Sequence, residues 1–218
     1  MSRYYPVFVD LGGRLAVVAG EGPEIAARAS ALLEVGARVR VVSPRPSVEV
    51  RRLADAGRVE LRDRPFEPGD LDGAAIAIAA GDAPTNEAVR AAARAARVPL
   101  NVVDRPELCD WIHGAVLRRG RLVVAISTSG AAPALAVRLR DQLAEELGAE
   151  YATFLEIAAE HRAPIAASGR SFADRRRVWY RLADSGVLAA LRDGDEARAR
   201  AIFAAELAAL EAPATGTA

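Results

Sequence analysis

The sequence contains no lysine, so all 29 of its basic residues are arginines. Every mechanism that needs a lysine amine is thereby excluded, including Schiff-base chemistry, a P-loop kinase and a reductase with a Tyr-x-x-x-Lys motif. Arginine still binds carboxylates well, because its guanidinium group forms paired hydrogen bonds with them and keeps its proton near neutral pH. A substrate that carries many carboxylates therefore remains compatible with this composition.

Cysteine and histidine are scarce as well. The chain has one cysteine, Cys109, and two histidines, His113 and His161. A single cysteine excludes an intrachain disulfide, and so few soft ligands argue against a structural zinc site. We therefore expect a cytoplasmic protein, and we predict no metal site within it.

Long apolar runs and net charge are also absent. No run approaches the roughly 20 residues that a membrane-spanning helix needs, and we expect no signal peptide before Tyr4. The 29 acidic residues balance the 29 basic ones, so no overall field attracts nucleic acid or an anionic membrane. We expect neither as a partner.

Aromatic residues make up only 5% of a chain that is 51% hydrophobic, so the core must consist of Ala, Val, Leu and Ile. Such a core suits parallel strands packed between helices. Apolar runs predict strands at residues 14–19, 38–42, 58–62, 74–80 and 99–103, and helical spacing predicts helices at 24–35, 47–56 and 84–97. This alternation predicts an α/β fold, a Rossmann-like doubly wound parallel sheet that binds ligands beyond the carboxyl ends of its strands.

The pattern changes after Asp104. Apolar runs at 112–117 and 122–126 flank Arg118-Arg119-Gly120-Arg121 and predict a hairpin, and residues 133–147 predict an amphipathic helix. From Tyr151 to about Leu210 the sequence predicts helices that are broken near Pro164, Gly169, Gly186 and Gly194. We expect a nucleotide-binding domain at 1–112, a hairpin and helix at 113–149, a helical domain at 150–212 and a frayed tail at 213–218.

A glycine turn joins the first predicted strand to the first predicted helix. In that setting backbone amides and the helix amino-terminus bind a pyrophosphate. Ile25 occupies the position where Gly or Ala normally permits close helix packing, unless a shift of one residue places Ala26 there. The alternative is an ordinary glycine turn that binds no cofactor. The predicted dinucleotide contacts are Gly20, Glu21, Gly22, Pro23, Glu24 and Ile25.

Later strands end at the same edge of the predicted sheet. Ser43-Pro44 lacks the carboxylate that usually holds the adenosine ribose, so Ser43 either donates to a ribose hydroxyl or begins a plain loop. The turn Ala80-Gly81-Asp82-Ala83-Pro84-Thr85-Asn86 either covers the nicotinamide half of the dinucleotide, with Gly81 and Asp82 as contacts, or simply holds Asp82 as the cap of the next helix. We also assign Asn101 and Val103 to the cofactor site.

Asp104 is the leading catalytic candidate. It follows a buried strand and begins an irregular segment, so its carboxylate is expected to face the crevice. There it could accept a proton while a hydride leaves the substrate, with a pKa set by partial burial. The alternative is an aspartate that hydrogen-bonds within its own Asp-x-Pro turn.

A second anion site is predicted at Ser127-Thr128-Ser129-Gly130, where hydroxyl and amide donors lie between a strand and a helix. Helix capping explains Ser129 equally well. His113 could assist proton transfer, bind substrate or touch a metal, although a structurally satisfied histidine is commoner.

Several of these segments occur together in one known family. Tyr5-Pro6-Val7-Phe8-Val9-Asp10-Leu11, the glycine turn, Asn101-Val102-Val103-Asp104 and the Ser-Thr-Ser-Gly-x-x-Pro stretch have the order and spacing found in precorrin-2 dehydrogenases. The sequence resembles this family, which includes the amino-terminal module of siroheme synthase, over about residues 4–148 and more loosely beyond them.

The resemblance implies an activity, a cofactor and partners. Members oxidise the tetrapyrrole precorrin-2 to sirohydrochlorin with NAD as hydride acceptor, and some are also ferrochelatases that insert ferrous iron to give siroheme. The family aspartate after Asn-Val-Val corresponds to Asp104. The family is usually a homodimer in which the hairpin and the following helix are exchanged. Two alternatives stay open: a non-catalytic NAD-binding redox-sensing module, and a chelatase that has lost its cofactor.

Overall fold

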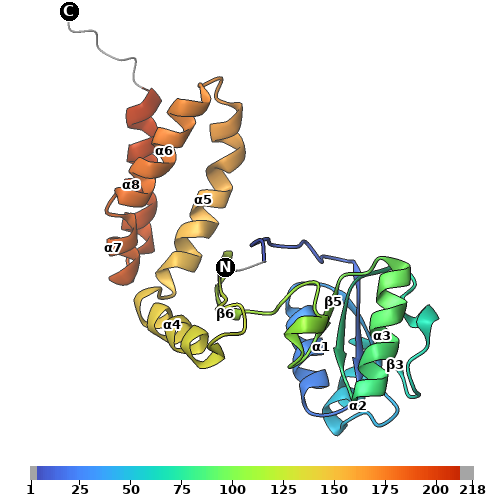
Figure 1. Cartoon of the computed structure of the whole chain (residues 1–218). Coiled ribbons are helices and arrows are strands. Elements are labelled where there is room, and N and C mark those ends of the chain that lie inside the picture. The colour runs from blue at the N-terminus through green and yellow to red at the C-terminus, as the bar shows by residue number, and fades with distance from the viewer. Residues whose placement is uncertain (1–3, 212–218) are drawn as a thin grey trace, which may run out of the picture. The chain divides into compact units, whose positions relative to one another are not determined.

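The computed structural model describes residues 4–211, which form two compact units that meet in the sequence between His113 and Gly114 (Figure 1). The tail predicted at 213–218 and the last residue of the predicted helical domain lie outside the described residues. None of the helices within residues 4–211 combines the length and the apolar character that crossing a bilayer requires.

A parallel sheet forms the centre of the first unit. Its strands are β1 (Leu15–Gly20), β2 (Arg38–Val42), β3 (Val59–Arg62), β4 (Ala74–Ala80) and β5 (Leu100–Val102), and their spatial order is β3-β2-β1-β4-β5. The chain order reverses between β1 and β4, which makes their carboxyl ends the switch point where doubly wound sheets bind ligands. The predicted Rossmann-like fold is confirmed.

Helices cover both faces of this sheet. On one face lie α1 (Glu24–Glu34) and α2 (Val48–Asp55), and on the other lies α3 (Ala83–Ala96) (Figure 1). Successive β1 residues point to opposite faces: Val17 packs in the core that contains Val89 of α3, and Val18 in the core that contains Ile25 of α1. Because both faces are buried at the centre of the sheet, β1 and β4 are continuous apolar runs, whereas β2 and β3 also carry charged residues such as Arg40 and Glu60.

Two short 3₁₀ helices, η1 (Pro68–Leu71) and η2 (Pro106–Leu108), connect elements of the first unit. The sequence analysis missed both, because three or four residues are too few to show a hydrophobic period. Each begins with a proline, whose fixed φ suits the first turn of a helix.

A hairpin of β6 (Ala115–Arg119) and β7 (Leu122–Ile126) opens the second unit and is followed by α4 (Pro133–Glu146). The prediction that the first strand begins at residue 112 and ends before Arg118 was wrong. The preceding residues are held by β5 instead, because the Trp111 carbonyl accepts a hydrogen bond of 3.0 Å from the Asn101 side chain. The strand therefore starts later and runs through both arginines.

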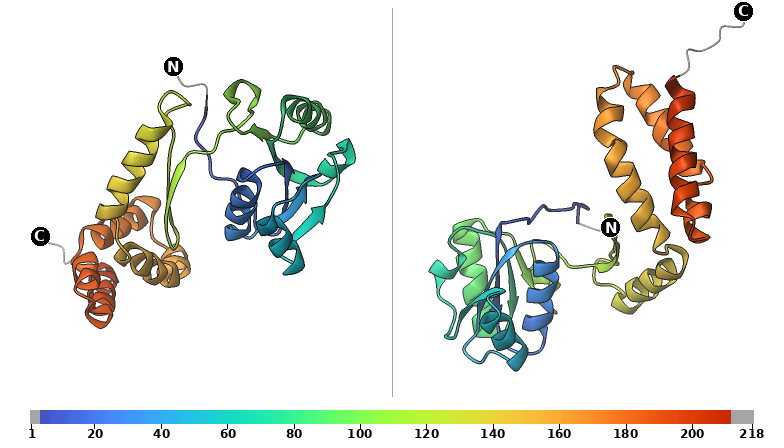
Figure 2. Two further views of the ribbon diagram at one scale, coloured as in Figure 1. Left: turned by 90° about the horizontal axis from the view of Figure 1, so that it is seen from below. Right: turned by 180° about the vertical axis from the view of Figure 1, so that it is seen from behind.

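The rest of the second unit is a bundle of α5 (Glu150–Ala167), α6 (Phe172–Asp184), α7 (Val187–Arg192) and α8 (Glu196–Glu211) (Figure 2). The predicted break at Pro164 was wrong, since this proline lies inside α5. A proline removes one helical hydrogen bond, and Ile157 and Ile165 on either side of it pack in the same core. The chain leaves the helix only near Gly169, where φ is +69°.

Candidate functional site

A cleft of about 510 Å³ lies at the carboxyl edge of the parallel sheet. Its lining comes from the residues at or just after the end of each strand, together with the first turns of α1 and α3. The predicted location of the ligand site at this edge therefore coincides with a real concavity. The local structure of each wall determines what the cleft can hold.

The glycine turn forms the wall after β1. Gly20 has a φ of +134°, and a Cβ there would lie 2.2 Å from the carbonyl oxygen of Ala80. The Glu21 N–H donates to the same oxygen at 2.9 Å, so the turn is built directly against the end of β4. At Gly22, φ is +102° and a Cβ would meet no other atom of the described structure within 4 Å. The backbone at Gly22 is therefore open to a ligand.

The amino-terminus of α1 follows this turn. Its N-cap residue is Pro23, and within the described residues no side chain caps the helix. Uncapped amides and the positive end of the helix dipole favour an anion. Glu24 lies in the first turn and pairs with Arg28 at 3.4 Å, which offsets part of its negative charge.

The wall after β4 is held by Asn86, the last residue of the turn that was predicted to cover the nicotinamide half. Asn86 is 5% exposed. Its Oδ1 accepts from the Gly81 N–H at 3.1 Å, and its Nδ2 donates to the Gly81 carbonyl at 2.9 Å. Asp82 does cap α3, with Oδ1 accepting from the Thr85 N–H at 3.0 Å. Hydrogen bonds from Thr85, with a smaller contribution from the charge of Arg45, lower the pKa of the Asp82 carboxyl.

The wall after β5 depends on two anchors. Asn101 is buried and donates to the Trp111 carbonyl, so its amide holds the loop instead of facing the cleft. Cys109 is half-buried, and its Sγ accepts from the Val102 N–H at 3.1 Å. Together these contacts tie the loop after β5 back onto the strand.

Asp104 sits on this loop and lines the cleft. Its φ is +59°, a left-handed conformation that Asp tolerates better than most residues and that is often found at functional sites. The side chain is exposed, and within the described part of the chain its carboxylate has no hydrogen bond or ion pair. The alternative that Asp104 hydrogen-bonds within its own turn is therefore not observed.

The walls after β2 and β3 carry an ion pair and an aromatic ring. Arg45 contacts Glu21 through Nε at 2.7 Å and through its terminal nitrogen at 2.5 Å. Ser43 is 1% exposed, and its Oγ has no hydrogen-bond partner among residues 4–211. Pro65 and Phe66 line the same end of the cleft.

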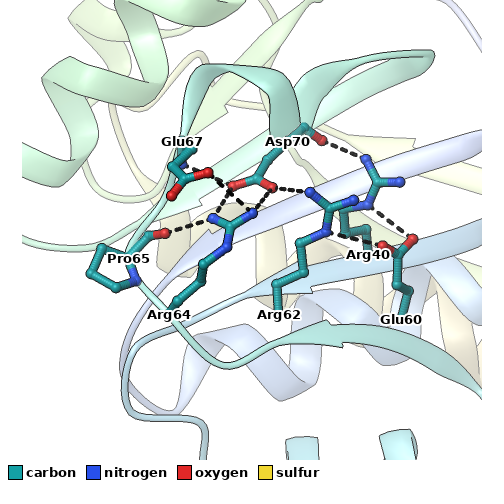
Figure 3. A network of polar contacts seen from close by, with 7 residues as sticks. All are labelled: Arg40, Glu60, Arg62, Arg64, Pro65, Glu67 and Asp70. Carbon is teal, nitrogen blue, oxygen red and sulfur yellow. Dashed lines mark hydrogen bonds and ion pairs between the residues drawn. The ribbon is translucent and has the colours of Figure 1, made fainter.

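A network around Asp70 includes the carbonyl of Pro65 (Figure 3). The Asp70 side chain is 0% exposed and accepts from both terminal nitrogens of Arg64, at 2.9 and 2.8 Å, and from Arg62 at 2.5 Å. Arg64 also donates to the Pro65 carbonyl at 2.9 Å. Burial alone would raise the pKa of the Asp70 carboxyl, but the hydrogen bonds from Arg64, the Glu67 N–H and Arg62 lower it below its usual range.

The cleft contains part of the predicted cofactor set. The predicted residues that line it, besides Asp104, are Gly20, Glu21, Glu24, Pro44, Gly81, Asp82 and Val103. Of the others, Ile25 is buried in the core, and the described lining also leaves out Gly22, Pro23, Ser43 and Asn101. Thr85, from the turn predicted to cover the nicotinamide half, also lines the cleft. Lining residues that the prediction missed include Arg45, Pro65 and Phe66, which the rule that ligands lie beyond the strand ends would have found.

The predicted substrate residues lie elsewhere. Ser127 to Gly130 belong to the second unit, and the exposed His113 is the last residue of the first. Ser127 Oγ accepts from the Ser129 N–H at 3.0 Å, and Thr128 Oγ1 accepts from the Ala132 N–H at 3.1 Å. The N-cap of α4 is Ala132, so Ser129 does not cap this helix. Binding of substrate by these residues stays a prediction.

Known families account for nearly the whole chain. Residues 7–115 match a family model described as putative NAD(P)-binding, 119–146 match the central region of sirohaem biosynthesis proteins, and 150–207 match the sirohaem synthase dimerisation region. The chain belongs to the siroheme synthase family. The resemblance inferred from the motifs is thus confirmed.

Members of this family with similar sequences include the siroheme synthases of Stutzerimonas stutzeri and Methylobacillus flagellatus. The first is 38% identical over 216 residues, or 98% of this chain and 46% of the relative. The second is 38% identical over 197 residues, or 89% of this chain and 42% of the relative. The chain therefore spans about half the length of the curated relatives that it matches.

A solved structure described as SirC, precorrin-2 dehydrogenase, has a similar fold. It matches with a TM-score of 0.72 and covers 95% of this chain and 99% of its own. The two sequences are 23% identical, so the likeness concerns the fold. The coverage extends over both the doubly wound unit and the helical unit that follows it.

Proposed function

We propose that this protein is an NAD-dependent precorrin-2 dehydrogenase, which oxidises precorrin-2 to sirohydrochlorin in siroheme biosynthesis. The observation that carries the proposal is the position of Asp104, an unpaired carboxylate in the same cleft as the glycine turn. Family membership supplies the substrate, because other members named siroheme synthase cover almost all of this chain. The arginine-only cationic surface is compatible with a substrate that carries many carboxylates.

The residues of the cleft fit a dinucleotide. Next to this lining, the open backbone at Gly22 and the uncapped end of α1 suit a pyrophosphate. Ser43, whose buried hydroxyl has no partner among the described residues, lies at the strand end where doubly wound folds hold a ribose. Glu21, Pro44 and Arg45 would then surround the adenosine half, and Gly81, Asp82 and Val103 the nicotinamide half. When bound, NAD supplies the hydride acceptor.

Asp104 would take up the proton. Oxidation of precorrin-2 to sirohydrochlorin removes two electrons and two protons, of which one proton leaves with the electron pair as a hydride. The second proton needs a base, and the unpaired Asp104 carboxylate is placed to accept it at an oxygen. Because Asp104 is exposed, that proton can pass on to water.

The second unit would complete the enzyme. We propose that Ser127, Thr128, Ser129, Gly130 and His113 bind the acetate or propionate arms of the tetrapyrrole. The match of residues 150–207 to a dimerisation region supports a homodimer.

Insertion of ferrous iron into sirohydrochlorin is a second activity that we propose for the same site, with iron as a substrate.

The test is conversion of precorrin-2 by the purified chain with NAD. We expect sirohydrochlorin to form, and Asp104→Ala to abolish its formation. A matched control is Asp55→Asn, an exposed carboxylate at the end of α2 outside the cleft, which should leave the rate unchanged. No conversion by the wild-type protein would overturn the proposal.

The rival function is a non-catalytic NAD-binding redox-sensing module. The observation that favours it is that the glycine turn lines a cleft suited to a dinucleotide, whereas the predicted substrate residues are not among the described lining of that cleft. Calorimetry separates the two functions: a sensor binds dinucleotide but no tetrapyrrole, whereas a dehydrogenase binds both.

A further inference from the structure

We propose that Arg45 selects the coenzyme of this cleft by binding a phosphate on the 2′-hydroxyl of the adenosine ribose. The protein would then accept NADP as well as NAD. This inference rests on the proposed function only in using the same dinucleotide cleft.

The end of β2 is the usual place of coenzyme selection in doubly wound folds. A carboxylate there accepts from the ribose 2′-hydroxyl in NAD-selective proteins, and a nearby arginine accommodates the 2′-phosphate in NADP-selective ones. Here β2 ends at Val42 and continues as Ser43-Pro44-Arg45. Nothing acidic on this strand end would repel a 2′-phosphate, and a cation stands where one would bind.

The carboxylate at this end of the cleft comes from the glycine turn instead. Glu21 is bound to Arg45 through two nitrogens, at 2.7 and 2.5 Å. The pair bridges the walls after β1 and β2, and it neutralises the charge that Glu21 would otherwise present to a phosphate. Without a nucleotide, Glu21 thus holds the Arg45 guanidinium beside the cleft.

Arg45 is able to exchange this partner. It is the one cationic side chain among the described residues that line the cleft. Its side chain is 82% exposed, whereas that of Glu21 is 33% exposed. An exposed ion pair of this kind adds little stability, while a guanidinium and a doubly charged phosphate form shorter, paired and stronger bonds. A 2′-phosphate would therefore displace the Glu21 carboxylate from Arg45.

Nucleotide fragments test the inference without the tetrapyrrole. Calorimetry on the full chain would compare 2′,5′-ADP with 5′-AMP, which differ by the 2′-phosphate, and NADP with NAD. We expect the wild type to bind the 2′-phosphorylated member of each pair at least as tightly as the other. Arg45→Ala should weaken 2′,5′-ADP and NADP about tenfold while changing AMP and NAD by less than about threefold.

Two further variants sharpen the result. Glu21→Gln releases Arg45 and should tighten binding of 2′,5′-ADP. Arg51→Ala removes an arginine that pairs with Asp63 at 2.9 Å outside the cleft, and it should change no affinity. Each variant should keep the melting temperature of the wild type, because both arginines are largely exposed.

Several outcomes overturn the inference: AMP binding much more tightly than 2′,5′-ADP to the wild type, equal weakening of both by Arg45→Ala, or no weakening of either. Failure to bind any nucleotide overturns both the inference and the proposed function. A protein that discriminates the 2′-phosphate through Arg45 but does not oxidise precorrin-2 leaves the inference standing and removes the proposed function.

Discussion

Gly20 lies against Ala80 so closely that a Cβ on Gly20 would stand 2.2 Å from the Ala80 carbonyl oxygen. These residues end β1 and β4, the strands between which the order of the sheet reverses. The glycine turn after β1 and the turn at Gly81 after β4 thus pack directly against each other at the switch point. Both turns form walls of the cleft.

Substitution of this glycine should therefore damage the fold and the site together. Gly20→Ala adds a methyl group against backbone that cannot move aside, at a φ that L residues avoid, and we expect a loss of about 2–3 kcal/mol in the free energy of unfolding. Gly22→Ala is the matched control, because φ is also positive there but the space is open; its cost should be about 1 kcal/mol. Urea denaturation measures both, and equal losses would contradict this account.

The Asp70 network should contribute stability that a neutral side chain cannot replace. Asp70→Asn removes the charge that holds Arg62 and Arg64, and we expect a loss of about 2 kcal/mol, less than for a fully buried pair because both arginines are partly exposed. Urea denaturation at neutral pH measures this loss. Since Arg64 also binds the Pro65 carbonyl, binding of AMP should weaken in the same variant. A variant as stable as the wild type would contradict the prediction.

The same carboxyl predicts a pH dependence. The pKa of Asp70 is lower in the folded protein than in the unfolded chain, where it is about 4. Between the two pKa values the unfolded chain binds more protons, so this stabilisation is complete above pH of about 4 and disappears as the pH falls through the folded pKa. The difference in unfolding free energy between wild type and Asp70→Asn should thus be largest near pH 7 and shrink in acid. A difference that does not change with pH would show that the charge is not responsible.

Asn86 should matter for the nicotinamide half of the cofactor. Removing its side chain breaks both hydrogen bonds to the partly buried Gly81, a cost of about 1 kcal/mol. We expect Asn86→Ala to weaken NAD binding while AMP, which occupies only the adenosine half, keeps its affinity. Calorimetry with the two ligands measures the difference, and equal effects on both would assign Asn86 a general structural role.

The sequence predicts the sheet well because its strands are buried on both faces. Two of them, Arg38–Val42 and Ala74–Ala80, have the predicted bounds, and so does Leu122–Ile126 in the hairpin. Local sequence patterns predict the bounds of an element poorly where contacts between distant residues determine them. One case is the start of β6, because Asn101 holds Trp111 outside the strand. The other is Pro164, which packing keeps inside α5.

In the cleft, too, some features can be predicted from local sequence patterns and others cannot. Its position follows from the alternation of strands and helices, and Asp104 follows from its place after a strand. The link between Glu21 and Arg45 joins residues 24 positions apart, and no local period indicates it. The clamp of Asn86 on Gly81 is closer in sequence, but an asparagine inside a predicted helix gives no sign that its side chain turns back to the preceding turn.

The central claim is that Asp104 accepts the proton in a dinucleotide-dependent oxidation. Its most direct test is the rate of NADH formation when precorrin-2 is mixed with saturating NAD, measured for wild type and Asp104→Asn together with the affinity of each for NAD. The account predicts one NADH for each sirohydrochlorin formed by the wild type, and a rate at least about a hundredfold lower for Asp104→Asn with unchanged NAD affinity. An Asp104→Asn protein that forms NADH at the wild-type rate would contradict it.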